Sequence, residues 1–352
     1  MTWPKISIVW LNYNSMKILP PVLQSLKSIA DLDYPSDRYE LIVVDNGSVD
    51  GSFERIREFL ERRSNLRKKI IRLDKNLGFT GGNNVGFAVR DRGSKYVLLL
   101  NNDAILLQQS LRALVEYAEG FSGLAGLQGV VLKYGTRLID SAGGYVNELL
   151  QPYSLGGGRE YPWVLRRPVY VTYVSGACAL LETGSILRCV GGRPFLSELF
   201  GYYDETALSL MLWSCGYRLV AVPEVVATHA GGLTFRKVGT LKAYLLERNR
   251  VALTLVTNTR YKHVVILQML RNLATSIPTE LRALLPTRTR AIVDGLELGR
   301  RLRSRGVFIN IYRAPVIRIP LKDLVYFFTS RYHVRRYHEE WALRNLKYLA
   351  VE

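Results

Sequence analysis

Short apolar runs alternate along the first 120 residues with segments in which apolar side chains recur at every third or fourth position. Unbroken Val, Ile and Leu runs are typical of strands buried on both faces of a parallel sheet, whereas the wider spacing predicts amphipathic helices. The predicted strands cover Ile6–Leu11, Tyr39–Val44, Lys69–Leu73 and Tyr96–Leu100, and the predicted helices cover Met16–Ile29, Ser52–Arg63, the residues from about 85 to Arg90, and Ser110–Ala118. This alternation predicts βαβ units and an α/β fold with a mostly parallel central sheet.

Polar or glycine-rich sequence follows each of these predicted strands. Asn12 follows the first strand and Asp45 the second, the segment Gly81-Gly82-Asn83 comes after the third, and Asn101-Asn102-Asp103 ends the fourth. Right-handed crossovers bring the carboxyl ends of parallel strands to one edge of the sheet, which is where ligands bind in open α/β folds. The four clusters therefore predict a cleft suited to a nucleotide. Simple turn formation is the alternative for each cluster, because Asn and Asp are ordinary turn formers.

The chain is less regular between about residues 125 and 235. Asp204–Cys215 predicts a helix that opens with two acids, and Tyr217–Val226 predicts a strand that leads to Thr228–Gly232. Acidic side chains at the start of a helix are favoured by the helix dipole, so this effect is the alternative to a catalytic role for Asp204 and Glu205.

The net charge of +18 indicates an anionic partner, such as nucleotide phosphates, nucleic acid or an acidic membrane surface. Residues 258–352 hold 18 Lys and Arg against 7 Asp and Glu, so a surplus of 11 positive charges lies in the last 95 residues. Basic side chains alternate there with aromatic and aliphatic ones, which predicts amphipathic helices that lie on an anionic membrane. The alternative is solvated helix faces that pack on the rest of the protein. No nucleic-acid-binding motif is present.

The sequence indicates no disulfide framework and no zinc site, because Cys178, Cys189 and Cys215 lack CxxC spacing. This cysteine usage fits a reducing cytoplasm. No apolar run reaches 18 residues and the first residues lack a signal-peptide pattern, so we expect neither a transmembrane helix nor secretion.

Several motifs together resemble the family 2 glycosyltransferases, and in particular their rhamnosyltransferase-like branch. In the first half of the chain they are Ile6–Asn14 (ISIVWLNYN), Val43–Ser52 (VVDNGSVDGS), Asn76–Gly86 (NLGFTGGNNVG) and Leu98–Asp103 (LLLNND). Later matches are Ser141–Gly144 (SAGG), Val190–Gly192 (VGG), Asp204-Glu205 before Leu208–Leu210, Gly216–Arg218 (GYR), His229–Gly232 (HAGG) and Arg248–Arg250 (RNR). The resemblance covers about residues 5–255 and implies a GT-A fold.

The resemblance implies a donor site for a nucleoside-diphosphate sugar, linked to UDP or dTDP. Asp45 would contact the nucleobase, and Asn12 with Gly81, Gly82 and Asn83 would lie along the nucleoside and phosphates. Asn101-Asn102-Asp103 stands at the family's metal-binding motif, so Asp103 would hold Mg²⁺ or Mn²⁺, with Asn101 as a further ligand. His229 would be a second metal ligand or a diphosphate contact. Asn102 would contribute to the donor site, and Arg248 and Arg250 would approach the diphosphate or the acceptor.

The pair Asp204-Glu205 falls where the family carries its catalytic base, in the reverse of the usual order. Register favours Glu205, and Asp204 is the alternative. Asn101 replaces an acid of the metal motif, which leaves Asp103 as the only charged ligand there, and Ala207 replaces a commonly acidic position. A single base opposite a good leaving group predicts direct displacement with inversion.

The sequence therefore predicts a GT-A catalytic domain over residues 1–257, with a nucleotide-binding half (1–120) and an acceptor half (121–257), and a basic helical extension over residues 258–352. The expected activity is metal-dependent transfer of a sugar to a hydroxyl of a glycan or polyprenyl-linked acceptor in polysaccharide biosynthesis. We expect the enzyme to lie on the inner face of the cell membrane and to bind no nucleic acid. The alternatives are a catalytically inactive nucleotide-sugar-binding protein and a charge-driven nucleic-acid-binding protein. A nucleotidyltransferase is disfavoured, because Asn12-Tyr13-Asn14 replaces the glycine-rich basic loop that it needs after the first strand.

Overall fold

The computed structural model describes residues 3–231, 239–276, 280–328 and 331–351. Its strands are β1 (Ile6–Asn12), β2 (Tyr39–Asp45), β3 (Lys68–Arg72), β4 (Tyr96–Asn101), β5 (Ala104–Leu106), β6 (Leu124–Lys133), β7 (Ile139–Ser141), β8 (Gly144–Val146), β9 (Pro152–Ser154), β10 (Val169–Tyr170), β11 (Cys178–Glu182) and β12 (Arg218–His229). Its α-helices are α1 (Leu19–Ala30), α2 (Ser52–Glu61), α3 (Gly78–Ala88), α4 (Ser110–Gly120), α5 (Thr183–Val190), α6 (Asp204–Ser214), α7 (Gly239–Val256), α8 (Lys262–Ser276), α9 (Leu285–Ser304) and α10 (Arg331–Asn345). Short 3-10 helices are η1 (Met16–Ile18), η2 (Ser36–Arg38), η3 (Ser197–Leu199), η4 (Glu280–Leu284), η5 (Ile311–Arg313) and η6 (Leu321–Phe328).

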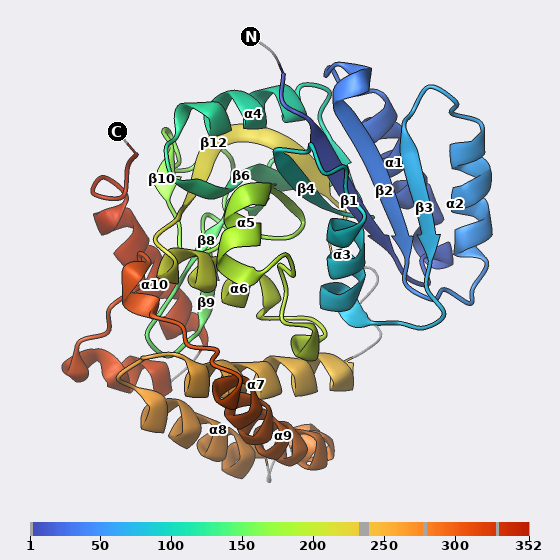
Figure 1. Ribbon diagram of the computed structural model, residues 1–352. Coiled ribbons are helices and arrows are strands. Elements are labelled where there is room, and N and C mark those ends of the chain that lie inside the picture. Colours follow the sequence, from blue (N-terminus) through green and yellow to red (C-terminus); the bar gives the residue numbers. More distant parts are fainter. Residues whose placement is uncertain (1–2, 232–238, 277–279, 329–330, 352) are drawn as a thin grey trace.

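A central sheet with the order β10-β12-β6-β11-β4-β1-β2-β3 organises the molecule (Figure 1). The four strands β3, β2, β1 and β4 are parallel, as the sequence predicts. Strand β11 runs antiparallel to both β4 and β6, and β12 is parallel to β6. The parallel half brings the carboxyl ends of β1, β2 and β4 together at one edge, so the predicted clustering of strand-end side chains is confirmed for these strands.

The side chains of the central strands alternate between two apolar layers, which fixes the strand register. One layer joins the sheet to α3, α5 and α6, and its members include Val9, Ile42, Phe87, Leu99, Ile186 and Leu208. The other joins the sheet to α1, α2 and α4, and its members include Ile8, Leu26, Leu41, Leu60, Leu98 and Leu114. Helices therefore cover both faces, as a parallel sheet requires.

The basic C-terminal region returns to the sheet rather than trailing away from it. Isolated β-bridges join Val169 to Ala350, Asn147 to Ile317 and Thr257 to Ile309. The ring of Trp341 in α10 packs on the ring of Tyr145, and Figure 1 shows α7, α8 and α9 as a layer at one end of the molecule. No helix of the described part of the chain is long and apolar enough to cross a membrane.

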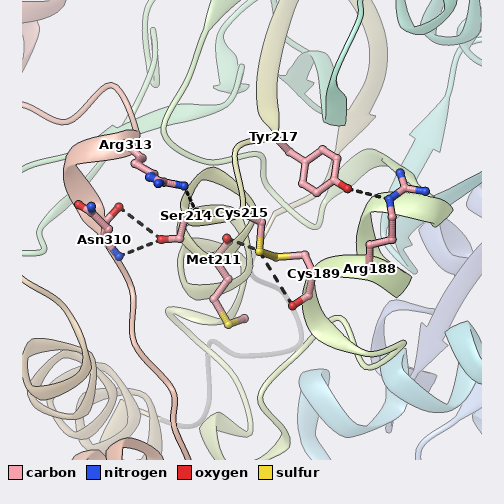
Figure 2. The surroundings of a disulfide bond; sticks show 8 residues. All are labelled: Arg188, Cys189, Met211, Ser214, Cys215, Tyr217, Asn310 and Arg313. Carbon is pink, nitrogen blue, oxygen red and sulfur yellow. Dashed lines mark hydrogen bonds between the residues drawn. A yellow bond between two sulfur atoms is a disulfide. The ribbon is translucent and has the colours of Figure 1, made fainter.

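The expectation of no disulfide is wrong, so cysteine usage no longer supports a reducing cytoplasm. Cys189 of α5 and Cys215, directly after α6, form a disulfide across 26 residues (Figure 2). The spacing of the cysteines in the sequence does not indicate this pair, because α5 and the end of α6 meet only in the folded chain. Asn310 and Arg313 also hold the end of α6, since the N–H of Asn310 donates to Ser214 Oγ at 2.8 Å and Arg313 donates to the Ser214 carbonyl at 2.6 Å.

Candidate active site

Asn12 is the centre of a buried hydrogen-bond network between three strand ends. Its side-chain amide donates to Asp45 Oδ1 at 2.7 Å, and the amide of Asn102 donates back to Asn12 Oδ1 at 3.3 Å. Asn12 and Asp45 have no exposed surface and Asn102 has little. The ends of β1, β2 and β4 are thus locked together beneath the edge of the sheet.

Asp45 uses both carboxylate oxygens inside the protein. Oδ1 accepts from Asn12, and Oδ2 accepts from the N–H of Ser48 at 3.0 Å. The second bond closes a turn after β2, so Asp45 has the turn-forming role that the sequence leaves as its alternative. Its predicted contact with a nucleobase remains a prediction.

The glycine-rich segment after β3 is helical and not a loop, and its predicted position along the nucleoside and phosphates remains a prediction. Gly81, Gly82 and Asn83 lie inside α3 and are buried. A Cβ on Gly82 would lie 2.3 Å from Leu11 Cδ1, and one on Gly81 would lie 2.5 Å from Leu77 Cβ. Gly82 therefore lets α3 pack closely against β1, and Gly81 leaves room for Leu77 directly before α3. The side chain of Asn83 donates to the Phe79 carbonyl within the same helix, so it too faces inward.

His229, the last residue of β12, joins two carboxylates that the sequence does not bring together. Its Nε2 lies 2.9 Å from Asp103 Oδ1, and its Nδ1 lies 2.8 Å from Asp140 Oδ2. Burial by itself would lower the pKa of His229, but the hydrogen bonds and charges of Asp103 and Asp140 outweigh burial and raise that pKa to about 9. The amide of Asn101 lies 3.4 Å from the same Nε2. Gly232 lies outside the described residues.

Asp103 and His229 fit two neighbouring ligands of one cation. Metal–ligand bonds of about 2.1 Å at right angles place adjacent ligand atoms about 3 Å apart, close to their observed separation. Asp140 lies on the other ring nitrogen, as a carboxylate that orients a metal-bound histidine does. No cluster of three or more His, Cys, Asp or Glu in the described ranges can hold a metal by itself. A cation here would therefore take its other ligands from a diphosphate and water.

Asp204 and Glu205 are neighbouring acids that open α6. Burial raises the pKa of Asp204 well above its ordinary value, and the neighbouring charge of Glu205 adds to this rise. Burial also raises the pKa of Glu205, but the N–H of Gly176 donates to Glu205 Oε1 at 3.0 Å and opposes the rise. Asp204 is 3% exposed, whereas Glu205 keeps some exposed surface. The pair thus favours a protonated Asp204 beside an ionised Glu205.

The arginines of the RNR motif in α7 make hydrogen bonds within the protein, and their predicted approach to the diphosphate or the acceptor remains a prediction. Arg250 is buried and donates to the Leu149 carbonyl and to the side chain of Gln268. Arg248 donates to the backbone carbonyls of Glu198 and Leu199. Hydrogen bonding inside the fold accounts for both.

A separate cavity of about 410 Å³ lies beside the disulfide. Its lining includes Arg193, Glu198, Met211, Arg305 and Phe308, and none of the predicted site residues. The candidate site is therefore defined by the strand ends and not by this cavity.

Sequence reasoning missed Asp140, Gly176 and Asn249. Asp140 directly precedes the SAGG motif and so stood next to a recognised signal. Gly176 has no neighbouring motif, and its role depends on the fold of the segment before β11. Asn249 was visible only as the middle residue of RNR.

Sequence comparison finds similarity to a known family in the N-terminal part of the chain. The family described as Glycosyl transferase family 2 matches residues 7–158. The poly(ribitol-phosphate) beta-N-acetylglucosaminyltransferase TarS of Staphylococcus aureus is 29% identical over 109 residues, which are 31% of this chain and 18% of TarS. The glycosyltransferase AglE of Haloferax volcanii is 29% identical over 119 residues, which are 34% of this chain and 37% of AglE. The matched segment thus spans well under half the length of these curated relatives.

Solved structures share the fold over most of the chain. The mannosyltransferase PcManGT from Pyrobaculum calidifontis, solved with GDP-Man and Mn²⁺, superposes with a TM-score of 0.53 at 16% identity and covers 87% of this chain and 80% of its own. Residues 1–349 of TarS with UDP-GlcNAc give a TM-score of 0.53 at 15% identity, over 86% of this chain and 92% of that one. The GT-A fold is thereby confirmed. Residues 7–158 match the family described as Glycosyl transferase family 2, and the chain has the fold of these solved glycosyltransferases.

Proposed function

We propose that this protein transfers a sugar from a nucleoside-diphosphate donor, UDP- or dTDP-linked, to a hydroxyl of a glycan or polyprenyl-linked acceptor, with inversion. The observation that carries the proposal is the pairing of Asp103 with His229 at the strand-end edge, 2.9 Å apart. The acidic pair at the start of α6 supplies the other chemical group that transfer needs. The solved neighbours that bind GDP-Man or UDP-GlcNAc support a nucleotide-sugar donor.

Asp103 and His229 would hold the divalent metal, with Asn101 beside them and Asp140 orienting the histidine. A bound Mg²⁺ or Mn²⁺ would act as a Lewis acid that neutralises the charge on the departing diphosphate. The Mn²⁺ in the PcManGT complex supports this choice of cofactor.

Glu205 is the proposed base. The acceptor oxygen bonds to the anomeric carbon, its proton passes to the Glu205 carboxylate, and the bond from that carbon to the diphosphate breaks with its electron pair. Positioned proton transfer of this kind contributes about 10²–10⁴-fold in rate. A protonated Asp204 next to it lowers the local negative charge and so keeps a second carboxylate from competing for the proton.

Turnover separates this function from a catalytically inactive sugar-nucleotide-binding protein. A panel of UDP-, dTDP- and GDP-linked sugars should yield at least one donor whose nucleoside diphosphate is released by the wild type. Glu205→Gln should reduce release at least 100-fold while it retains donor binding. Binding without turnover of any donor, with glycan and polyprenyl-phosphate acceptors present, would favour the inactive protein instead.

We further propose that the C-terminal region docks the enzyme on an anionic membrane, at the inner face of the cell membrane. The outward side of α8 supports this, because Leu267 and Leu270 are each more than half exposed next to the exposed Arg271. No acidic residue occurs in α8. The guanidinium of Arg271 lies 5.9 Å from the ring of Phe328, which ends η6, and Leu321 and Val325 of η6 are 76% and 61% exposed.

Vesicle flotation tests this docking surface. Wild-type protein should float with vesicles that contain phosphatidylglycerol and should bind pure phosphatidylcholine weakly, since apolar insertion and charge act together. The double variant Leu267→Asn with Leu270→Asn should lose most of this binding and keep donor binding. Leu187→Asn, which changes an exposed leucine of α5, serves as the matched control. Equal flotation of the double variant and the wild type would refute the surface.

A further inference from the structure

The residues that precede the acidic pair form a strained loop, here called the base loop (residues 197–203). Phe200, Tyr202 and Tyr203 have φ values of +64°, +63° and +62°. This left-handed region is uncommon for bulky side chains, and such residues persist only where the surroundings over-determine the backbone. Contacts from other elements must therefore stabilise this backbone conformation of the base loop.

Arg248 and Asn249 of α7 make these stabilising contacts. Arg248 Nη2 donates to the carbonyls of Glu198 and Leu199 at 2.9 and 2.8 Å. Asn249 Nδ2 lies 3.0, 2.8 and 2.8 Å from the carbonyls of Leu199, Gly201 and Tyr202. The Asn249 side chain has no exposed surface, so these carbonyls are its partners in place of water.

The base loop also contacts the start of α3, the helix that contains Gly81-Gly82-Asn83, and the sequence predicts that this segment lies along the donor. The N–H of Thr80 donates to the Phe200 carbonyl at 3.4 Å, and Thr80 Oγ1 donates to the Ser197 carbonyl at 3.1 Å. A Cβ on Gly78 would lie 2.2 Å from that same Phe200 carbonyl oxygen, so the two backbones approach as closely as glycine allows. The loop thus joins the helix that follows β3 to the helix that begins with Asp204 and Glu205.

We infer that Arg248 and Asn249 are positioning residues, which hold the base loop and so fix the Asp204–Glu205 pair against the donor side of the site. The inference rests on the proposed function for what the pair does. In this inference the RNR motif has a role other than ligand contact. Its side chains in α7 donate to backbone carbonyls of the base loop, and the loop in turn positions the carboxylates of Asp204 and Glu205. Misplacement of a reacting group by about 1 Å can cost about 100-fold in rate.

Asn249→Ala and Arg248→Lys test the inference against the matched control Asn258→Ala. Asn258 lies just beyond α7 and bonds to Asn310 and Ile311, so its loss disturbs the same region without touching the base loop. Asn249→Ala should lower kcat roughly 100-fold with little change in nucleotide affinity, and should shift the pH profile of kcat. Arg248→Lys keeps a cationic donor and should retain more activity than Arg248→Ala. The control should change neither kcat nor the pH profile.

Amide hydrogen exchange provides a readout that does not depend on activity. Residues 198–205 should exchange faster in Asn249→Ala than in the wild type or in Asn258→Ala. Unchanged exchange of this segment would overturn the inference. So would a wild-type kcat and pH profile in a folded Asn249→Ala protein, or parallel losses in Asn249→Ala and the control. If the wild type transfers no sugar at all, the proposed function fails, and the exchange experiment still decides whether α7 holds the loop.

Discussion

At the scale of single residues, the candidate site depends on His229 and the two carboxylates on either side of it. Asp103 faces one ring nitrogen and Asp140 the other, so the orientation of the imidazole is fixed before any ligand arrives. Partners of this kind typically change metal affinity by about 10–100-fold when they are removed. The candidate site therefore includes Asp140, which the sequence analysis did not name as a site residue.

Asp140→Asn should weaken Mn²⁺ binding about 10-fold, because the amide no longer orients His229 as strongly through Nδ1. Titration calorimetry of Mn²⁺ into protein that is mixed with nucleoside diphosphate measures this affinity, since the cation takes part of its ligands from the diphosphate. Asp37→Asn changes an exposed carboxylate of η2 and should leave the affinity unchanged. An Asp140→Asn protein that binds Mn²⁺ like the wild type would show that Asp140 does not support a metal ligand.

Asp204 predicts a pH dependence of stability with a definite sign. Its folded-state pKa is raised, so the stability linked to this group is fully present below its ordinary pKa of 3.8 and is lost as pH rises through the folded value. Asparagine never ionises, so Asp204→Asn should raise the melting temperature relative to wild type more at pH 8 than at pH 5. Thermal unfolding at the two pH values measures this difference, and an equal shift at both would contradict a protonated Asp204.

At the scale of elements, close packing of α3 on β1 explains the glycines that resembled a phosphate loop. Gly82→Ala should lower the free energy of unfolding by about 1–3 kcal/mol, because the new Cβ meets Leu11 at 2.3 Å. Gly120→Ala at the end of α4 is the control, since no atom lies within 4 Å of its Cβ position. Equal stability of the two variants in denaturant unfolding would show that close packing is not the reason for Gly82.

The disulfide between α5 and α6 should stabilise the half of the molecule that carries the acidic pair. Closing a loop of 26 residues contributes roughly 3 kcal/mol in the chain-entropy account. Cys189→Ser should therefore lower the melting temperature, and a reductant should lower that of the wild type but not of the variant. A wild type that is unaffected by reductant and contains two free thiols at Cys189 and Cys215 would contradict the disulfide.

The local pattern of apolar and polar residues predicted the parallel half of the fold, but it could not predict the contacts between distant segments. The runs at Tyr39–Val44 and Tyr96–Leu100 end within one residue of β2 and β4, because buried parallel strands read as continuous apolar sequence. The packing role of Gly82 could not be predicted, because a glycine that admits a neighbouring strand looks the same in sequence as one that admits a phosphate. Asp140 and the Cys189–Cys215 pair depend on tertiary contacts that no periodicity encodes.

At the scale of the whole molecule, the C-terminal region is both part of the core and the main source of positive charge. Ala342 of α10 and Leu346, directly after α10, are buried in the same apolar cluster as Val9 of β1. The exposed apolar and basic side chains of α8 and η6 then lie on a surface that is fixed relative to the sheet. Catalysis and membrane docking would therefore be coupled through a shared core in one molecule.

The central claim is that the strand-end edge binds a nucleoside diphosphate together with a divalent metal at Asp103. Titration calorimetry of UDP, dTDP and GDP, with and without Mn²⁺, tests it on wild type, Asp103→Ala and the control Asp37→Ala. We predict that one nucleotide binds wild type and control only with Mn²⁺, and that Asp103→Ala loses this binding. Folded wild-type protein that binds none of the three nucleotides, or binds one equally well without Mn²⁺ and after Asp103→Ala, would contradict the claim.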